Sequence, residues 1–165
     1  MNLLEHFDFD PSSYAEIAGL LAFNVNQPVE TCEEVAERRR LSGDKQPLVL
    51  VADDEPLIRM TIVQILRQEG YDAVAACDGE EAVECALKTK PDIFLADIAM
   101  PGMNGVDAAK KIKESLPETR VICFSGHAAA PVLLYETLQE GYDFEFLSKP
   151  IKPHALIQAI RSSRC

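Results

Sequence analysis

The stretch PDIFLADIAMPGMNG, residues 91–105, combines the pattern of a buried strand with a single acid. Its apolar run, residues 93–96, ends on Asp97. Turn-forming residues follow at Pro101, Gly102, Asn104 and Gly105. An apolar run bounded by turn residues is typical of a buried strand. Because open α/β sheets place their chemistry at the carboxyl ends of strands, the stretch predicts that Asp97 lies at a functional edge.

Short apolar runs recur along the chain from Pro47 onward and alternate with helical patterns. Strands are expected over residues 48–52, 73–76, 93–96, 120–124 and 144–147. Helices are expected from Pro56 to a stop at Gly70, and over residues 80–89, 106–115, 132–140 and 153–162. Their spacing points Ile58, Ile62, Ile65 and Leu66 of the first helix inward, and Ala82, Val83, Ala86 and Leu87 of the second. The alternation predicts a flavodoxin-like, doubly wound (βα)₅ parallel sheet in the order 2-1-3-4-5.

Residues 1–46 lack this alternation and are predicted to be a helical extension of the α/β domain at residues 47–165, with a linker at residues 42–46. Capping boxes at Ser13 and Thr31 predict two helices, the second ending near Leu41. Residues 38–40 are three consecutive arginines. They could bind an acidic partner or lipid headgroups, but cations at a helix C-terminus are more often solvated and favoured by the helix dipole, and we adopt that interpretation.

Composition bounds the class of protein. The 165 residues carry a formal net charge of −11, which disfavours nucleic acid as a partner because such binding depends on neutralising phosphates. No apolar run is long enough to span a bilayer, and the acidic N-terminus lacks the basic region of a secretory signal. The odd number of cysteines and the absence of a CxxC motif predict reduced cytoplasmic thiols, with no disulfide framework and no zinc site. These cysteines are Cys32, Cys77, Cys85, Cys123 and Cys165.

Polar residues stand at the carboxyl ends of four predicted strands: Asp53, Asp54, Asp97, Ser125 and Lys149. Three close carboxylates repel each other, so the pattern predicts a hard cation such as Mg²⁺ among them. A carboxylate, a cation, a lysine and a hydroxyl are the groups that phosphoryl transfer needs. Each has an ordinary alternative role, since an aspartate or serine often caps a helix or turn and a lysine is often solvated. Their coincidence at four strand ends favours a site.

The chain from Pro47 to Arg164 resembles the response-regulator receiver domain family, through VLVADDEP, FLADIAMPGMNG, VICFSGHA and FLSKPI in that order. The resemblance implies that Asp97 is the phosphoacceptor and that Lys149 contacts the phosphoryl group. It implies a cis bond between Lys149 and Pro150 and a switch hydroxyl at Ser125. The implied Mg²⁺ ligands are Asp54, Asp97, the Ala99 carbonyl and, through water, Asp53.

Two parts of the motif depart from the most studied relatives. The switch aromatic falls on Phe146, which has no hydroxyl and could equally be a core strand residue. The positions that flank the incoming water hold Ala99 and His127, so the lifetime of the phosphate stays open.

The resemblance implies a histidine kinase or histidine phosphotransfer protein as phosphodonor, an unknown downstream protein as target, and no nucleic acid or membrane partner. No output domain is expected after the last helix, so we expect action by protein contact or phosphorelay, with homodimerisation open. We expect no enzymatic activity beyond self-phosphorylation and dephosphorylation. An aspartyl phosphatase would need D-x-D at the first strand, which has Asp53 followed directly by Asp54. A receiver-like interaction module independent of phosphorylation is the other alternative.

Overall fold

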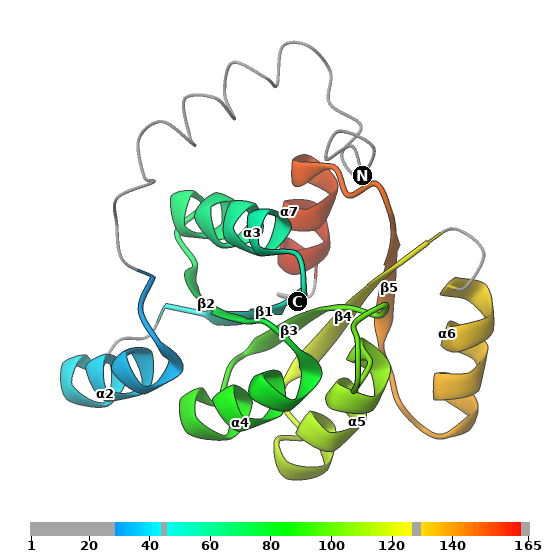
Figure 1. The fold of residues 1–165 in the computed structure, drawn as a ribbon, viewed down its shortest axis with the longest axis horizontal. Helices are drawn as coiled ribbons and strands as arrows, with labels where there is room; N and C mark the ends of the chain where they lie inside the picture. Colours follow the sequence, from blue (N-terminus) through cyan, green and yellow to red (C-terminus); the bar gives the residue numbers. More distant parts are fainter. Residues whose placement is uncertain (1–28, 44–45, 127–129, 163–165) are drawn as a thin grey trace.

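The computed structural model describes residues 29–43, 46–126 and 130–162 (Figure 1). The helix predicted after Ser13, together with His127 and Cys165, lies outside these residues. Five parallel strands form one sheet in the order β2-β1-β3-β4-β5, which confirms the predicted topology. The strands are β1 (Leu48–Ala52), β2 (Asp72–Ala76), β3 (Ile93–Asp97), β4 (Arg120–Ser125) and β5 (Glu145–Ser148). The helices are α2 (Cys32–Ser42), α3 (Pro56–Gln68), α4 (Gly79–Thr89), α5 (Gly105–Ser115), α6 (Ala130–Gln139) and α7 (Pro153–Arg161).

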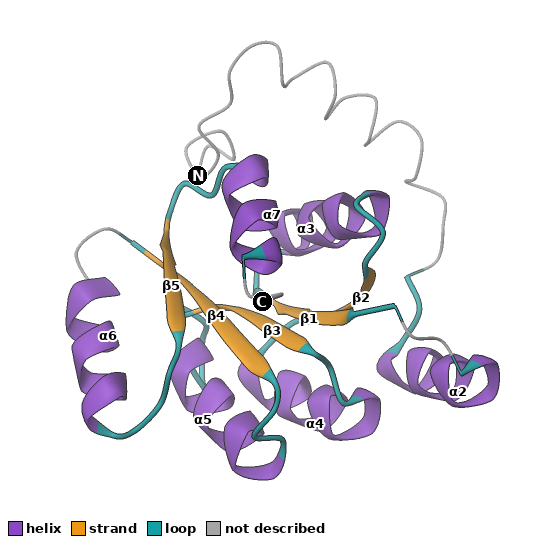
Figure 2. Cartoon of the chain, turned by 180° about the vertical axis from the view of Figure 1, so that it is seen from behind, coloured by secondary structure: helices purple, strands orange, loops and turns teal. Residues whose placement is uncertain are grey.

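The helices cover both faces of the sheet, with α3 and α7 on one side and α4, α5 and α6 on the other (Figures 1 and 2). All residues of β1 and β3 are buried, because these central strands have helices above and below. Alternate strand residues serve the two cores, so that Val49 and Val51 pack with α3 and α7, whereas Leu50 and Phe94 pack with α4 and α5. Each predicted apolar run therefore contributes side chains to both hydrophobic cores, one on each face of the sheet.

The predicted inward faces of the first two helices are mostly correct. Ile58, Ile62, Ile65 and Leu66 of α3 are all buried. On α4, Ala82 and Ala86 are buried and Val83 is partly buried. The prediction for Leu87 is wrong, since 48% of it is exposed while Cys85 is 1% exposed. The buried face of α4 is therefore shifted by one residue from the face that the sequence predicts.

Helix α2 lies beside α4, at the β2 edge of the sheet (Figures 1 and 2). Its predicted capping box is confirmed, because Thr31 accepts from the Glu34 backbone and Glu34 accepts from the Thr31 backbone. A disulfide joins Cys32 of α2 to Cys85 of α4. The expectation of reduced thiols is therefore wrong for this pair. The two cysteines are 53 residues apart in sequence, so their 5.4 Å Cα–Cα separation follows from the packing of two helices and from no local pattern.

The solvated interpretation of the arginines is wrong for Arg38 and Arg39. Both pair with Asp72, which is 7% exposed, at 2.9 and 3.1 Å respectively. Only Arg40 fits the expectation, since it is exposed and pairs with Glu37 on the same helix. A buried carboxylate needs a charged partner, so α2 supplies two guanidinium groups to the start of β2.

Asp72→Ala is expected to lower the free energy of unfolding by about 1 to 3 kcal/mol, because it removes the buried carboxylate that Arg38 and Arg39 share and leaves them only their other acceptors, among them the Glu30 carboxylate and the Gln46 carbonyl. Urea unfolding of the full chain measures the change. Glu37→Ala is the matched control, since it removes an exposed pair on the same helix and should produce no resolvable change. Equal effects of the two variants would contradict the assignment.

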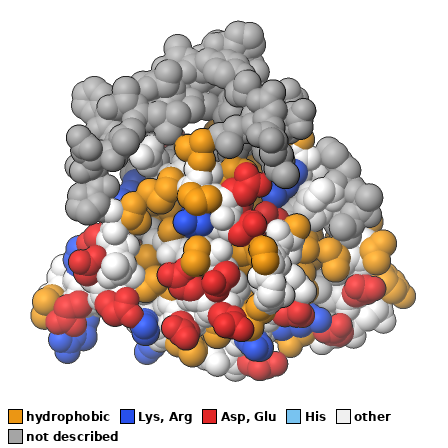
Figure 3. Space-filling view, viewed as in Figure 1, with side chains coloured by type: hydrophobic (Ala, Val, Ile, Leu, Met, Phe, Trp, Pro, Cys, Tyr) orange, Lys and Arg blue, Asp and Glu red, His pale blue; other side chains and the backbone are white. Residues whose placement is uncertain are grey.

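Helix α6 carries exposed apolar residues on the outer side of the molecule, visible as the apolar area at the α6 edge in Figure 3. They are Val132, Leu134, Tyr135 and Leu138. Within the described residues, no helix has the length and apolar character needed to cross a bilayer.

Candidate functional site

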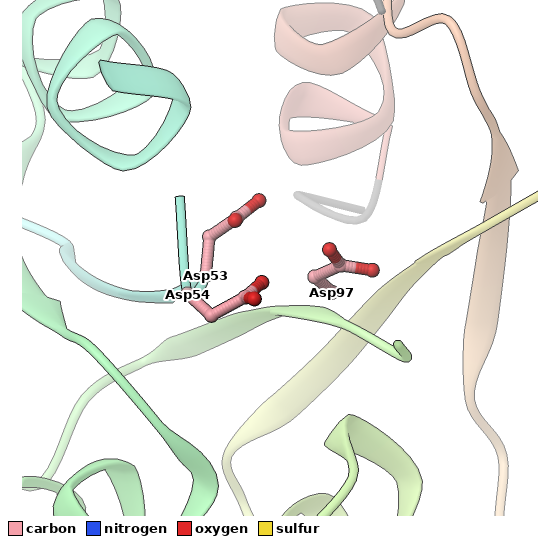
Figure 4. Close-up of side chains that lie close together, drawn as sticks. All are labelled: Asp53, Asp54 and Asp97. Atoms are coloured by element: carbon pink, nitrogen blue, oxygen red, sulfur yellow. The ribbon is translucent and has the colours of Figure 1, made fainter. Parts of the chain in front are cut away.

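Two neighbouring strands end side by side and bring the three acids together. Because β1 and β3 pair in parallel, with Ala52 opposite Ala96, the residues that follow them share one edge of the sheet. Asp53, Asp54 and Asp97 each have a carboxylate oxygen within 4.8 Å of those of the other two (Figure 4). The convergence predicted from the sequence is thus present.

The three acids have different surroundings. Asp53 is fully buried, and its Oδ1 accepts a 2.8 Å hydrogen bond from the Glu55 backbone. Its Oδ2 is buried and has no hydrogen-bond partner within the part of the chain that the structure describes. Asp97 is 3% exposed, whereas Asp54 is exposed. The cluster therefore opens to solvent on the side of Asp54 and has an unsatisfied oxygen at its buried end.

Lys149 reaches Asp97 from the end of β5. Its Nζ lies 2.8 Å from Asp97 Oδ2, and the other oxygen, Oδ1, accepts a 3.1 Å hydrogen bond from the Ala99 backbone. The Lys149–Pro150 bond is cis, as the family resemblance implies. The predicted ammonium group is thus in direct contact with the predicted nucleophile.

Ser125 is buried at the end of β4, where its hydroxyl bonds to the backbone of the following residue. Ser125 Oγ donates a 3.0 Å hydrogen bond to the Gly126 carbonyl. Phe146 on β5 is partly buried against the core shared with α4 and α5. Ala99, which lies two residues after Asp97 in the sequence, is exposed.

The turn after β3 requires glycine at position 105. A Cβ atom there would lie 2.3 Å from the Asp97 carbonyl oxygen, which is closer than backbone atoms tolerate. The Gly105 amide also donates to the Ile98 carbonyl at 3.3 Å. This close approach folds the turn against Asp97 and fixes the end of β3.

Burial raises the pKa of Asp53 to about 6, opposed by the hydrogen bond from the Glu55 backbone and reinforced by the charges of Asp97 and Asp54. Such a carboxylate would be stabilised in its charged form by a cation next to it. The unsatisfied Asp53 Oδ2, the exposed Asp54 and the nearby Asp97 offer only oxygen ligands. This donor set fits Mg²⁺ and gives no support to a soft metal.

Asp53→Asn is expected to raise the free energy of unfolding by about 1 to 3 kcal/mol near neutral pH in EDTA. The pKa of Asp53 is 3.8 in the unfolded chain and about 6 in the folded one. At pH values between these two, Asp53 therefore binds a proton more often in the folded state than in the unfolded state. The free energy of unfolding therefore falls as pH rises through this range. Above about pH 6, the full cost of burying the charged Asp53 carboxylate remains. Asparagine removes the penalty and keeps the acceptor for the Glu55 backbone.

Urea unfolding of the parent chain and of Asp53→Asn, in EDTA from about pH 4 to about pH 7, tests this prediction. The difference between them should grow with pH. Adding Mg²⁺ should shrink or reverse it, because only the parent keeps the third carboxylate. A difference that is independent of pH would contradict the role assigned to burial.

Sequence reasoning missed Arg59. Its Nη1 donates to the Asp53 carbonyl, so α3 holds the segment that carries the acids. Arg59 lies six residues after Asp53, within a helix whose start was predicted, but no pattern indicates that its side chain turns back toward the strand end.

Comparison with known proteins identifies close relatives over most of the described chain. The family model of the response regulator receiver domain matches residues 49–161. The transcriptional regulatory protein PdtaR of Mycobacterium tuberculosis is 41% identical over 115 residues, which are 68% of this chain and 54% of that protein. This chain thus spans about half the length of PdtaR.

Two chemotaxis proteins are matched over nearly their whole length. CheY of Thermotoga maritima is 35% identical over 113 residues, which are 68% of this chain and 92% of that protein. The crystal structure of CheY4 from Vibrio cholerae superimposes with a TM-score of 0.65 at 27% identity, covering 71% of this chain and 98% of that one.

Proposed function

This chain belongs to the response regulator receiver domain family of two-component systems, and we propose that it is a phosphoryl-accepting switch in which Asp97 is the acceptor. The observation that carries the proposal is the contact of Lys149 with Asp97 inside a cluster of three carboxylates that holds an unsatisfied buried oxygen. A purely structural cluster of acids would gain nothing from leaving that oxygen without a partner.

The reaction that suits this geometry is transfer from a phosphohistidine of a histidine kinase or phosphotransfer protein. A carboxylate oxygen of Asp97 attacks phosphorus, the bond between phosphorus and the imidazole nitrogen breaks, and the nitrogen keeps the electron pair. The product is an acyl phosphate on Asp97. Lys149, held by Asp97 before transfer, is placed to neutralise a phosphoryl oxygen as charge moves to the new group.

Asp54 and Asp97 would hold Mg²⁺ directly, with Asp53 through a water and with the Ala99 carbonyl as a further ligand. A bound Mg²⁺ supplies positive charge that offsets the carboxylates and the incoming phosphoryl oxygens. The chain's own part is to keep Asp53 and Asp97 buried at the ends of the neighbouring strands β1 and β3, while the exposed Asp54 leaves the cluster open to solvent.

The conformational response would begin at Ser125. Its hydroxyl now donates to the Gly126 carbonyl, and a phosphoryl group on Asp97 would offer it a stronger, charged acceptor. Movement of the β4 end would let Phe146 follow inward and change the surface of α6, β5 and α7. That surface is where we expect a downstream protein to read the phosphorylated state.

Intact-mass analysis after incubation with acetyl phosphate and Mg²⁺ tests the proposal. One added phosphoryl group is expected, and EDTA should suppress it. The same mass in every condition would instead support an interaction module that ignores phosphate. Turnover of a phosphomonoester substrate without a lasting adduct would support a phosphatase.

A further inference from the structure

The attachment of α2 to the α/β domain has little apolar support. The helix has 11 residues, and only Cys32 and Val35 of them are buried. Isolated helices of this length are marginal in water. Its polar contacts include the ion pairs of Arg38 and Arg39 with Asp72, the ion pair of Glu33 with Lys88, and the hydrogen bond from Arg39 to the Gln46 carbonyl. The disulfide between Cys32 and Cys85 is therefore the strongest single restraint on the position of α2.

The disulfide borders a pocket that opens to solvent. A pocket of about 410 Å³ is lined by both Cys32 and Cys85, and its wall includes residues of α2, α3, β2 and α4. Cys32 is 8% exposed. An attacking thiolate needs access to one sulfur atom, so a disulfide that faces such a pocket is open to exchange.

The third cysteine of this pocket is poorly suited to exchange with the disulfide. Cys77 is exposed and lines the same pocket. A hydrogen bond to Glu81, together with partial burial and the charge of Asp78, raises the pKa of Cys77 to about 11. The Cys77 thiol is thus protonated near neutral pH and is a weak nucleophile. The raised pKa of Cys77 therefore favours reduction of the disulfide by an external thiol over exchange with Cys77.

We propose that the Cys32–Cys85 disulfide is a redox-controlled clasp, which holds α2 on the α/β domain when oxidised and releases it when reduced. Reduction by a dithiol breaks the S–S bond, leaves one thiol on each cysteine and converts the dithiol to its disulfide, a transfer of two electrons and two protons. Oxidation by the same couple reverses the step. The clasp adds a thiol–disulfide input to the chain and does not depend on phosphorylation at Asp97.

Release of α2 would uncover a defined surface. It would expose the side of Val35 that is buried against the domain, separate Arg38 and Arg39 from Asp72, and uncover part of α4 and the β2 edge. The acids at the ends of β1 and β3 are not part of this interface. Helix α2 is therefore expected to respond to redox conditions while the core of the sheet does not.

The full chain, equilibrated in oxidised or reduced dithiothreitol, tests the clasp by two readouts. Peptide mapping without reductant should find the Cys32 and Cys85 peptides linked in the oxidised sample and separate in the reduced one. Amide hydrogen exchange should then be at least ~10-fold faster in α2 after reduction, with β3 unchanged. Exchange is measured without any phosphodonor, so its failure would leave the proposed function standing.

Cys32→Ser removes the clasp from the α2 side and leaves the core of the domain intact. It should show fast α2 exchange in both buffers, and Cys85→Ala should do the same. Cys77→Ser is the matched control and should behave as the parent. Unlinked Cys32 and Cys85 peptides in the oxidised sample would overturn the proposal, and so would linked peptides with equal α2 exchange in both buffers.

Discussion

Asp97→Asn is expected to abolish the phosphoryl adduct that acetyl phosphate and Mg²⁺ form on the parent chain. The amide cannot act as the nucleophile, and the substitution also removes the charge that holds Lys149 at 2.8 Å. Asp53 and Asp54 keep their positions at the end of β1, so the variant should stay folded. Intact mass spectrometry measures the adduct directly.

Asp143→Asn is the matched control for this experiment. Asp143 is exposed in the loop before β5, outside the acidic cluster. Its replacement removes one charge from the chain, as Asp97→Asn does, and should leave the adduct at the parent level. A full adduct on Asp97→Asn would show that another group accepts the phosphoryl group.

Lys149→Gln is expected to affect both stability and chemistry. In EDTA it leaves the buried Asp97 carboxylate among two other acids without its cation, which should lower the free energy of unfolding by about 2 to 4 kcal/mol. Mg²⁺ should restore part of this loss, because it brings another positive charge to the cluster. Phosphorylation should slow about 100-fold even with Mg²⁺, since the charge that Lys149 offers to the phosphoryl group is gone.

Urea unfolding with EDTA or Mg²⁺ and the time course of intact mass separate these two effects. Lys111→Gln, at an exposed position of α5, is the control for the loss of a lysine and should match the parent in both measurements. A Lys149→Gln variant that phosphorylates at the parent rate would contradict the role given to Lys149, whatever its stability.

The sheet and the acidic site were predictable because their signals are local. Each strand is a short apolar run, and parallel pairing then places the residues after β1, β3, β4 and β5 at one edge. Asp53, Asp54, Asp97 and Lys149 could thus be brought together without coordinates. The hydroxyl of Ser125 was placed at the correct strand end, but its hydrogen bond to the Gly126 carbonyl depends on the turn that follows.

The parts that sequence reasoning missed are contacts between distant segments. Asp72 is buried at the start of β2, where Arg38 and Arg39 of α2 pair with it. Cys32 meets Cys85 through the same packing of α2. Neither cysteine has a neighbour in sequence that indicates its partner, and a count of cysteines gives no pairing. The displaced inward face of α4 has the same cause, since Cys85 rather than Leu87 turns to the interior.

The claim that Asp97 is the phosphoacceptor is tested most directly by locating the modified residue. Borohydride reduces an aspartyl phosphate to homoserine, which tandem mass spectrometry assigns to one position of the chain. After treatment with acetyl phosphate and Mg²⁺, we expect homoserine at position 97 and at no other, and none when EDTA replaces Mg²⁺. Homoserine at position 53 or 54, or none under any condition, would contradict the claim.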